Sequence, residues 1–332
     1  MNIKFLKILR CPVSMQMLTL KAAEYYPGKT RVKSGVLVSE DGTHEYAVVE
    51  GIPRFVKCEN YSSSFGYEWK KWSRVQFESE NAGKPMQGHT ERMFDVLSGL
   101  SGADLKGKLC VEFGCGPGRF LEVVRSRGGI AVGIDMSEAV EPARRNFEED
   151  DDVMIVQGDI LNPPFDRNIF DFAYSFGVLH HTPQPASGLE NLVAVSKRGA
   201  RVACCVYHRG GFYDYVSVYL YRKIHNLIKS FMGNYPALFY SYLSANYIFY
   251  ILAFIKKIPK VRRIAYILEK YALVNLEIPD ANWRFLDIFD AITPYYASTH
   301  TGEEVSGWFE KAGCEEIRTT EWCPTSIVAV KK

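Results

Sequence analysis

The stretch that decides the fold is LCVEFGCGPGRF, residues 109–120. Its first five residues are an apolar run typical of a buried strand, and RFLEVVRSRG, from residue 119, has helical spacing. Between them lie Gly114, Gly116 and Gly118. A strand that turns through glycines into a helix presents backbone N–H groups to a ligand. We therefore predict a ligand-binding loop at residues 114–118, Cys115 included.

The glycine spacing departs from the dinucleotide pattern G-x-G-x-x-G. Counted from Gly114, the last position is Arg119, and counted from Gly116 it is Leu121, where a small residue is needed. The pattern is E-x-G-x-G-x-G, with Glu112 just before the loop. A carboxylate there repels a pyrophosphate but attracts the ammonium of a methionine moiety, directly or through water.

Two acidic residues give the loop a more specific interpretation. Asp135 ends the apolar run IAVGID, where a carboxylate can bind both hydroxyls of a ribose. Asp159 ends VMIVQGD beside Ile160, which offers an acceptor for the adenine amino group and an apolar wall for its ring. A glycine loop alone can be a tight turn, and either acid alone can cap a helix. The interpretation depends on all three features together.

Short apolar strands alternate with helices along the middle of the chain. Expected strands are 109–114, 130–135, 153–159, 170–177, 201–207, 315–322 and 326–331, and expected helices are 88–100, 119–128, 137–150, 185–199 and 301–313. This alternation predicts an α/β fold with a doubly wound, mostly parallel seven-stranded sheet.

We expect five parts along the chain: 1–57, 58–87, 88–211, 212–280 and 281–332. The first is a small β-rich domain, because its valine-rich runs are separated by Asp-Gly turn chemistry. The second is an aromatic connector or lid, in which Tyr67 and Trp69 either close over the ligands or pack in the core. The third binds the cofactor, the fourth is a helical insert, and the fifth completes the sheet.

The insert contains an uncharged run, GNYPALFYSYLSANYIFYILAF, residues 233–254. It is long enough to cross a bilayer, but Pro236, two asparagines, two serines and several tyrosines weaken its hydropathy, so we expect no transmembrane span. Its position after the fifth strand favours a substrate cap above the carboxyl edge of the sheet. Contact with a membrane surface or a lipid substrate is the alternative.

Composition argues against a largely disordered or fibrous chain. Hydrophobic residues make up 47% and charged residues 23%, which is ordinary globular usage. Forty basic and thirty-eight acidic residues give a net charge of +2, so nucleic acid is not an expected partner. Eight scattered cysteines and an N-terminus without a long apolar run predict a cytoplasmic protein.

Residues about 88–207 and 300–330 resemble a class I S-adenosylmethionine (SAM)-dependent methyltransferase. The likeness lies in VEFGCGPGRF, VGIDMS, QGDILNPPF and FDFAYSFGVLHHTPQP. It implies SAM as the cofactor. It also implies these contacts: Gly114, Gly116 and Gly118 at the methionine end, Asp135 at the ribose, Met136, Asp159 and Ile160 at the adenine, and Ser175 and Phe176 near the sulfonium.

The first domain resembles the small zinc-ribbon-like domain of tRNA methyltransferase activators, in LRCPVSMQMLTL and YAVVEGIPRF. The family's CPxC motif is incomplete, because Ser14 stands in the second cysteine position. Cys11, His44 and Cys58 are too few and wrongly spaced for a tetrahedral site, so we predict no metal.

Methyl transfer from SAM mainly requires an acceptor held in line with the sulfonium. A base is needed if the acceptor is a hydroxyl or a protonated amine, and His180 or His181 is the candidate, unless the pair is only a structural loop element. The sequence favours transfer to an oxygen or nitrogen of a small molecule or saccharide, lipid-linked acceptors included. The alternatives are an RNA-modifying methyltransferase and a catalytically silent SAM-binding or partner-docking protein.

Overall fold

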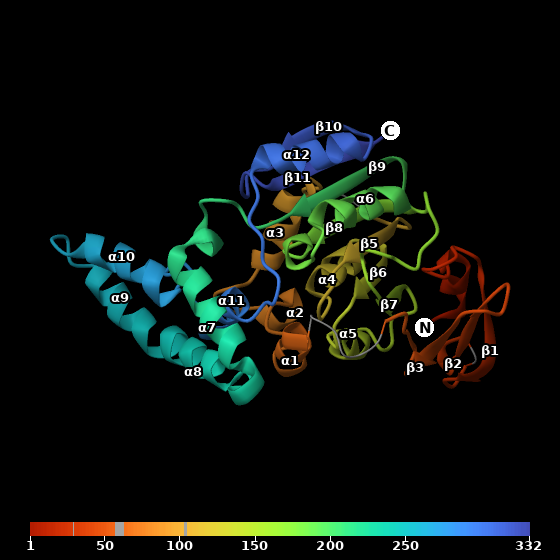
Figure 1. Ribbon diagram of the computed structural model, residues 1–332, viewed down its shortest axis with the longest axis horizontal. Helices are drawn as coiled ribbons and strands as arrows, with labels where there is room; N and C mark the ends of the chain where they lie inside the picture. The colour runs from red at the N-terminus through yellow and green to blue at the C-terminus, as the bar shows by residue number, and fades with distance from the viewer. Residues whose placement is uncertain (29, 57–62, 103–104) are drawn as a thin grey trace.

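The computed structural model describes residues 1–28, 30–56, 63–102 and 105–332. Two sheets organise it, a small antiparallel one near the N-terminus and a seven-stranded one in the middle of the molecule. A set of helices projects from the end opposite the small sheet (Figure 1).

The seven-stranded sheet has the order β10-β11-β9-β8-β5-β6-β7. Its strands are β5 (Leu109–Phe113), β6 (Ile130–Asp135), β7 (Val153–Gln157), β8 (Phe170–Phe176), β9 (Ser196–Cys205), β10 (Cys314–Thr319) and β11 (Ser326–Lys331). Strands β5 to β9 pair in parallel, whereas β11 is antiparallel to β9 and β10. The predicted doubly wound, mostly parallel sheet is confirmed.

Helices cover both faces of this sheet. They are α3 (His89–Ser98), α4 (Arg119–Ser126), α5 (Val140–Asn146), α6 (Pro185–Val195) and α12 (Gly302–Lys311). Apolar side chains of α3, α4 and α5 form one buried cluster with the sheet, and those of α6 and α12 belong to another. The expected helix 185–199 ends earlier, because Ser196 already pairs with Phe170 as the first residue of β9.

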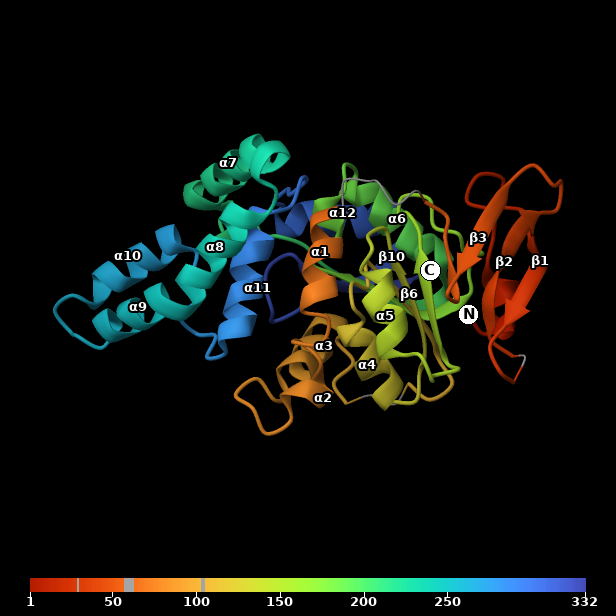
Figure 2. The ribbon, with the colours of Figure 1, turned by 90° about the horizontal axis from the view of Figure 1, so that it is seen from below.

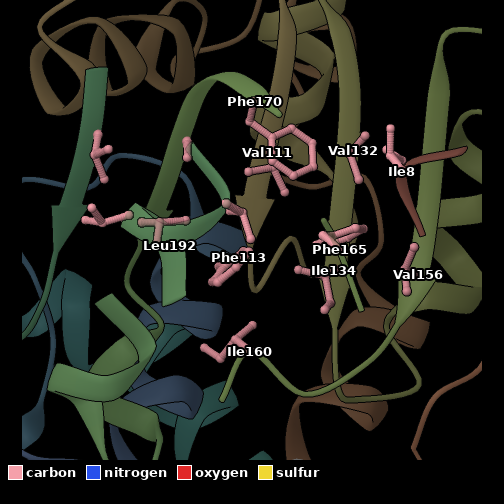
Figure 3. Packing of buried hydrophobic residues seen from close by; sticks show 14 of the residues in the cluster. Ile8, Val111, Phe113, Val132, Ile134, Val156, Ile160, Phe165, Phe170 and Leu192 are labelled. Atoms are coloured by element: carbon pink, nitrogen blue, oxygen red, sulfur yellow. The ribbon is translucent and has the colours of Figure 1, made fainter. Parts of the chain in front are cut away.

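The N-terminal domain holds a 3-10 helix, η1 (Ile3–Ile8), and the antiparallel strands β1 (Leu18–Tyr25), β2 (Val32–Ser39), β3 (Glu45–Val49) and β4 (Ile52–Pro53). Its apolar core continues into the main sheet: Ile8 lies among Val132, Val156 and Phe165 (Figure 3). Arg54 donates to the Gln157 side chain at 2.7 Å, and the Phe55 amide donates to the Gln157 carbonyl oxygen at 2.8 Å.

Within the described residues, no three His, Cys, Asp or Glu side chains are grouped as metal ligands. Cys11 is buried beside the Tyr46 hydroxyl, 3.1 Å away. Cys58 lies outside the described residues.

The connector is more helical than its serines and glycines suggested. It contains α1 (Ser63–Lys71) and a short α2 (Glu78–Asn81). Its aromatic residues explain the difference, since Trp69 and Trp72 pack against a buried apolar cluster and Trp72 lies 4.5 Å from the Phe285 ring. Burial of these rings stabilises a helix that local composition alone does not favour.

The insert consists of a short 3-10 turn, η3 (Phe212–Asp214), then α7 (Val216–Met232), α8 (Tyr235–Leu243), the π-helical turn η4 (Ser244–Ile248), α9 (Phe249–Lys256) and α10 (Arg262–Ala272). Helix α11 (Ala281–Ile292) packs against α7, α8 and η4. The helical part therefore extends to residue 292, and the sheet-completing segment begins after it, not at 281.

We call residues 216–272 the arm, because α8, α9 and α10 reach away from the sheet (Figure 2). The continuous helix Tyr235–Lys256 is long and apolar enough to cross a bilayer, judged by length and composition only.

Candidate functional site

A cavity of about 930 Å³ opens at the carboxyl ends of the parallel strands. Its walls come from the residues after β5, β6, β7, β8 and β9, from α1 and from α11. This is the edge where doubly wound sheets bind ligands, and the volume lies near the upper end for small-molecule sites. The cavity can hold a cofactor and an acceptor together.

The glycine loop forms one wall. Gly114, Gly116 and Gly118 have φ angles of +78°, +51° and +97°. A Cβ atom on Gly114 would lie 2.3 Å from a methyl carbon of Val178, and one on Gly118 would lie 2.6 Å from the Phe147 ring. The glycines at 114 and 118 are therefore required both by backbone conformation and by close packing. Gly114, Cys115 and Gly116 line the cavity, and Gly118 begins α4 behind it.

Asp135 ties the loop to the end of β6. One carboxylate oxygen accepts the Gly116 amide at 2.9 Å, and the other accepts the amide and hydroxyl of Ser137 at 2.8 and 2.6 Å. Burial raises the pKa of Asp135, while these hydrogen bonds oppose the shift. The sequence-predicted ribose-binding acid is thus held rigidly at the cavity wall.

The residues expected at the adenine also line the cavity: Met136, Asp159 and Ile160. Asp159 accepts the Leu161 amide at 2.8 Å through one oxygen. Burial raises its pKa. Ile160 is buried and supplies the apolar surface.

Glu112 lines the cavity below the glycine loop and is buried. Burial raises its pKa well above the usual range, and the nearby Arg119 guanidinium opposes that shift. Arg119 also lines the cavity, with its guanidinium 4.3 Å from the centre of the Phe120 ring. Sequence analysis used Arg119 only to exclude a dinucleotide, and its place in the wall was missed.

Ser175 is not where the resemblance implied. Its side chain is fully buried and donates to the Phe113 carbonyl at 2.9 Å, outside the cavity lining. Alternation along β8 explains this, because neighbouring side chains of a strand point to opposite faces. Phe176 does line the cavity, and its ring lies on the same face as Tyr174, 5.1 Å away.

Of the two connector candidates, Trp69 lines the cavity and Tyr67 does not. The Trp69 indole faces Gly116, and its nitrogen would lie 3.4 Å from a Cβ atom there. Tyr67 is 39% exposed and packs its ring 6.4 Å from that of Phe289.

Between them in α1, Glu68 faces the cavity and was not singled out from the sequence. It is 1% exposed, and neither carboxylate oxygen has a hydrogen-bond partner among the described residues. Burial raises its pKa well above the usual range, and Asp290 adds to the shift. A ligand that donates hydrogen bonds is the missing partner for such a group.

The two histidines both line the cavity, and their hydrogen bonds distinguish them. Nδ1 of His181 lies 2.8 Å from the Tyr296 carbonyl oxygen, which only accepts, so Nδ1 carries the proton and Nε2 the lone pair. Nδ1 of His180 accepts the Tyr207 amide at 3.2 Å, so its proton is on Nε2. Both Nε2 atoms are buried without a partner among the described residues.

Both imidazoles are neutral. Burial lowers the pKa of His181 to about 3 and that of His180 well below its usual range. His181 is therefore an acceptor facing the cavity and His180 a donor. Only His181 has the form that a general base requires.

Helix α11 adds two acids that sequence analysis missed. Asp287 accepts the Tyr213 hydroxyl at 2.8 Å, and Asp290 accepts that of Tyr207 at 3.1 Å. Burial raises the pKa of each acid to about 6. The two tyrosine rings stack 3.7 Å apart, and His180 stacks on Tyr207 at 3.6 Å. The available signal was two acids three residues apart in a helix whose other polar residues are Asn282 and Arg284.

A doubly wound sheet with a glycine loop, an acid at the end of the next strand and a second acid after the third defines the class of nucleoside-binding α/β domain. Residues 111–204 match the family model described as "Methyltransferase domain". This part of the chain is therefore similar to a methyltransferase domain.

Two curated relatives are also named as methyltransferases. The chain is 31% identical over 117 residues to a demethylmenaquinone methyltransferase of Clavibacter sepedonicus, covering 35% of this chain and 47% of that protein. It is 32% identical over 100 residues to a ubiquinone biosynthesis O-methyltransferase of Coxiella burnetii (strain Dugway 5J108-111), covering 30% and 43%. The chain thus spans less than half the length of these curated relatives.

Among solved structures, it resembles an S-adenosylmethionine dependent methyltransferase from Mesorhizobium loti. The identity is 24%, the TM-score is 0.31, and the match covers 33% of this chain and 50% of that one.

S-adenosylmethionine is the cofactor expected from the sequence. The residues present fit it. Gly114 and Gly118 leave no room for side chains, and acids stand at the end of β6 and after β7. Ile160 offers an apolar surface, and Glu112 and Glu68 are buried carboxyls facing the cavity.

Proposed function

We propose that this protein is a SAM-dependent methyltransferase that methylates an oxygen or nitrogen atom of a small molecule or saccharide. The observation that carries the proposal is a single cavity, bounded at one wall by the glycine loop and Asp135 and at another by the free Nε2 of His181. When bound, SAM supplies an electrophilic methyl group on a sulfonium.

The cofactor contacts of this proposal follow the strand ends. Asp135 binds the ribose hydroxyls, and Asp159 accepts from the adenine amino group beside Met136 and Ile160. The glycine loop lies at the methionine end, where the missing side chains of Gly114 and Gly116 let the ligand approach the backbone closely. Glu112 lies close enough to that loop to attract the ammonium.

On the acceptor side, His181 receives the proton that an O–H or N–H acceptor loses. Its Nδ1–H bond to a backbone carbonyl fixes the ring, and its low pKa keeps Nε2 unprotonated at neutral pH. Glu68 and the acids of α11 accept hydrogen bonds from the hydroxyl or amino groups of the acceptor.

Titration calorimetry with SAM and with S-adenosylhomocysteine tests cofactor binding, and the absence of binding to both refutes the proposal. Asp135→Ala should weaken the affinity by about 100-fold, since two hydrogen bonds to a charged group contribute about 1.5 kcal/mol or more each. Tyr67→Ala, a change outside the cavity, should bind as the wild type does.

Transfer itself is tested with methyl-labelled SAM incubated with extracts and with candidate sugars, amines, lipids and RNA. Label on a small molecule or saccharide supports the proposal, and label on RNA alone supports the RNA-modifying alternative instead. With the acceptor in hand, His181→Gln should lower kcat by roughly 10²- to 10⁴-fold and leave SAM affinity unchanged.

A further inference from the structure

Charge is distributed very unevenly along this chain. The arm carries nine basic residues and one acidic residue, a formal charge of +8, in a chain whose net charge is +2. The rest of the molecule therefore carries −6. The basic residues at the tip, Lys257, Lys260, Arg262 and Arg263, are all exposed.

The same arm exposes an apolar stripe along the continuous helix of α8, η4 and α9. We define the stripe as Tyr235, Phe239, Tyr242, Tyr247, Tyr250 and Phe254, all of which are exposed. Successive members are three or four residues apart except at one step of five, from Tyr242 to Tyr247. That step falls on the π-helical turn Ser244–Ile248, where i→i+5 bonding keeps the two side chains on one face. Their rings lie 6.0 Å apart.

The arm does not close the cavity. Residues 211–213, 275 and 277–279, on either side of it, contribute to the cavity lining, and helices α7 to α10 contribute no residue. The expectation of a substrate cap thus fits only the flanks of the insert. The exposed apolar surface of the arm needs another explanation.

The arm is nevertheless firmly mounted. Arg284 of α11 is fully buried and donates to the carbonyl oxygens of Ala245, Ile278 and Pro279 at 2.8 to 3.1 Å. Its guanidinium also lies 3.5 Å from the centre of the Phe249 ring. Because Arg284 fixes the middle of the arm, the apolar stripe is a stable feature of the surface.

We propose that the arm binds the surface of an anionic lipid bilayer. Tyrosine and lysine side chains favour the interface between headgroups and acyl chains, and phenylalanine adds apolar burial. Exposed basic residues at the tip complement anionic headgroups. A second copy of the chain would bring another arm of charge +8 against the first, which repulsion disfavours.

Flotation of the full-length protein with lipid vesicles tests this. We expect binding to phosphatidylcholine vesicles that contain about 30% phosphatidylglycerol, weak binding to phosphatidylcholine alone, and loss of binding as salt rises from about 0.1 to 0.5 M. Equal binding to both vesicle types, or binding to neither, overturns the proposal.

Two sets of substitutions locate the surface. Lys257→Glu, Arg262→Glu and Arg263→Glu together should weaken vesicle affinity roughly 100-fold or more, since each basic residue contributes about a fivefold factor. Phe239→Ser with Phe254→Ser should weaken it by a similar factor. The matched control, Lys7→Glu, Lys21→Glu and Lys108→Glu, reverses the same charge on exposed residues outside the arm. An equal loss in the control overturns the proposal.

Two further measurements test the alternatives to surface binding, which are a second copy of the chain on the stripe and an arm that crosses the bilayer. A dimer that Phe239→Ser with Phe254→Ser dissociates in sedimentation, without vesicle binding by the wild type, assigns the stripe to a second copy. Protein that resists carbonate extraction from vesicles crosses the bilayer. Either result overturns surface binding. Urea unfolding curves confirm that each variant folds, and none of these measurements depends on SAM, so they succeed or fail separately from the proposed function.

Discussion

Gly114→Ala should destabilise the fold by about 2–5 kcal/mol. An alanine at φ +78° costs roughly 1–2 kcal/mol in backbone strain. Its Cβ atom would lie 2.3 and 2.4 Å from the two methyl carbons of Val178, and such overpacking costs about 1–3 kcal/mol more. Because the loop must move to relieve the contact, SAM affinity should fall as well.

A matched control separates the two costs. Gly199 has a φ of +75° and no atom within 4 Å of an added Cβ, so Gly199→Ala should cost only the backbone part. Val178→Ala removes the two clashing methyl groups but keeps a Cβ atom 2.8 Å away, so it should recover only part of the roughly 1–3 kcal/mol of overpacking in the Gly114→Ala background. Urea unfolding monitored by circular dichroism measures the wild type, the three single variants and the double variant. Equal destabilisation at positions 114 and 199, or additive effects of the Gly114 and Val178 changes, would refute the reasoning.

Three further outcomes are expected. Burial raises the pKa of Asp287 from 3.8 to about 6, so the contribution of Asp287 to stability is complete below about pH 4 and is lost as the pH rises through 6. In urea titrations, the free energy of unfolding of Asp287→Asn should therefore be up to about 3 kcal/mol higher than that of the wild type at pH 8, and equal to it at pH 4. Arg284→Met leaves three backbone carbonyls without their donor and should cost about 3 kcal/mol or more, with faster amide exchange in α8 and α9 measured by mass spectrometry. A hydrogen bond from Cys205 lowers the pKa of Cys323 to about 6, so iodoacetamide at pH 7 should alkylate Cys323 first among the seven described cysteines, and Cys205→Ala should slow that reaction in peptide mapping.

Local sequence pattern was sufficient to predict the residues of one wall of the cavity. The glycine loop, Asp135 and Asp159 each follow a short apolar strand, and parallel strands place their carboxyl ends at one edge. Ser175 was misplaced although the rule needed was available. Alternation along β8 puts Ser175 opposite Tyr174 and Phe176, so only one of the two predicted residues could face the cavity.

The acceptor side depended on contacts between distant parts of the chain. The roles of His180 and His181 differ because one ring meets the Tyr207 amide and the other meets the carbonyl of Tyr296, 115 residues away. No pattern around the two histidines contains that information. Glu68 could not be predicted for a similar reason. It faces the cavity because the aromatic residues around it pack against a distant apolar cluster and make the connector helical.

Helix α11 connects the two proposals physically. Asp287 and Asp290 project from it into the cavity, while Arg284, on the same helix, holds the arm. Residues that flank the arm in sequence, 211–213, 275 and 277–279, also line the cavity. If the arm rests on a lipid surface, the wall of the cavity that carries these acids is the one joined most directly to that surface. A lipid-linked acceptor would then meet the cavity at the side of His181 and the acids of α11, away from the strand ends that we propose for the cofactor.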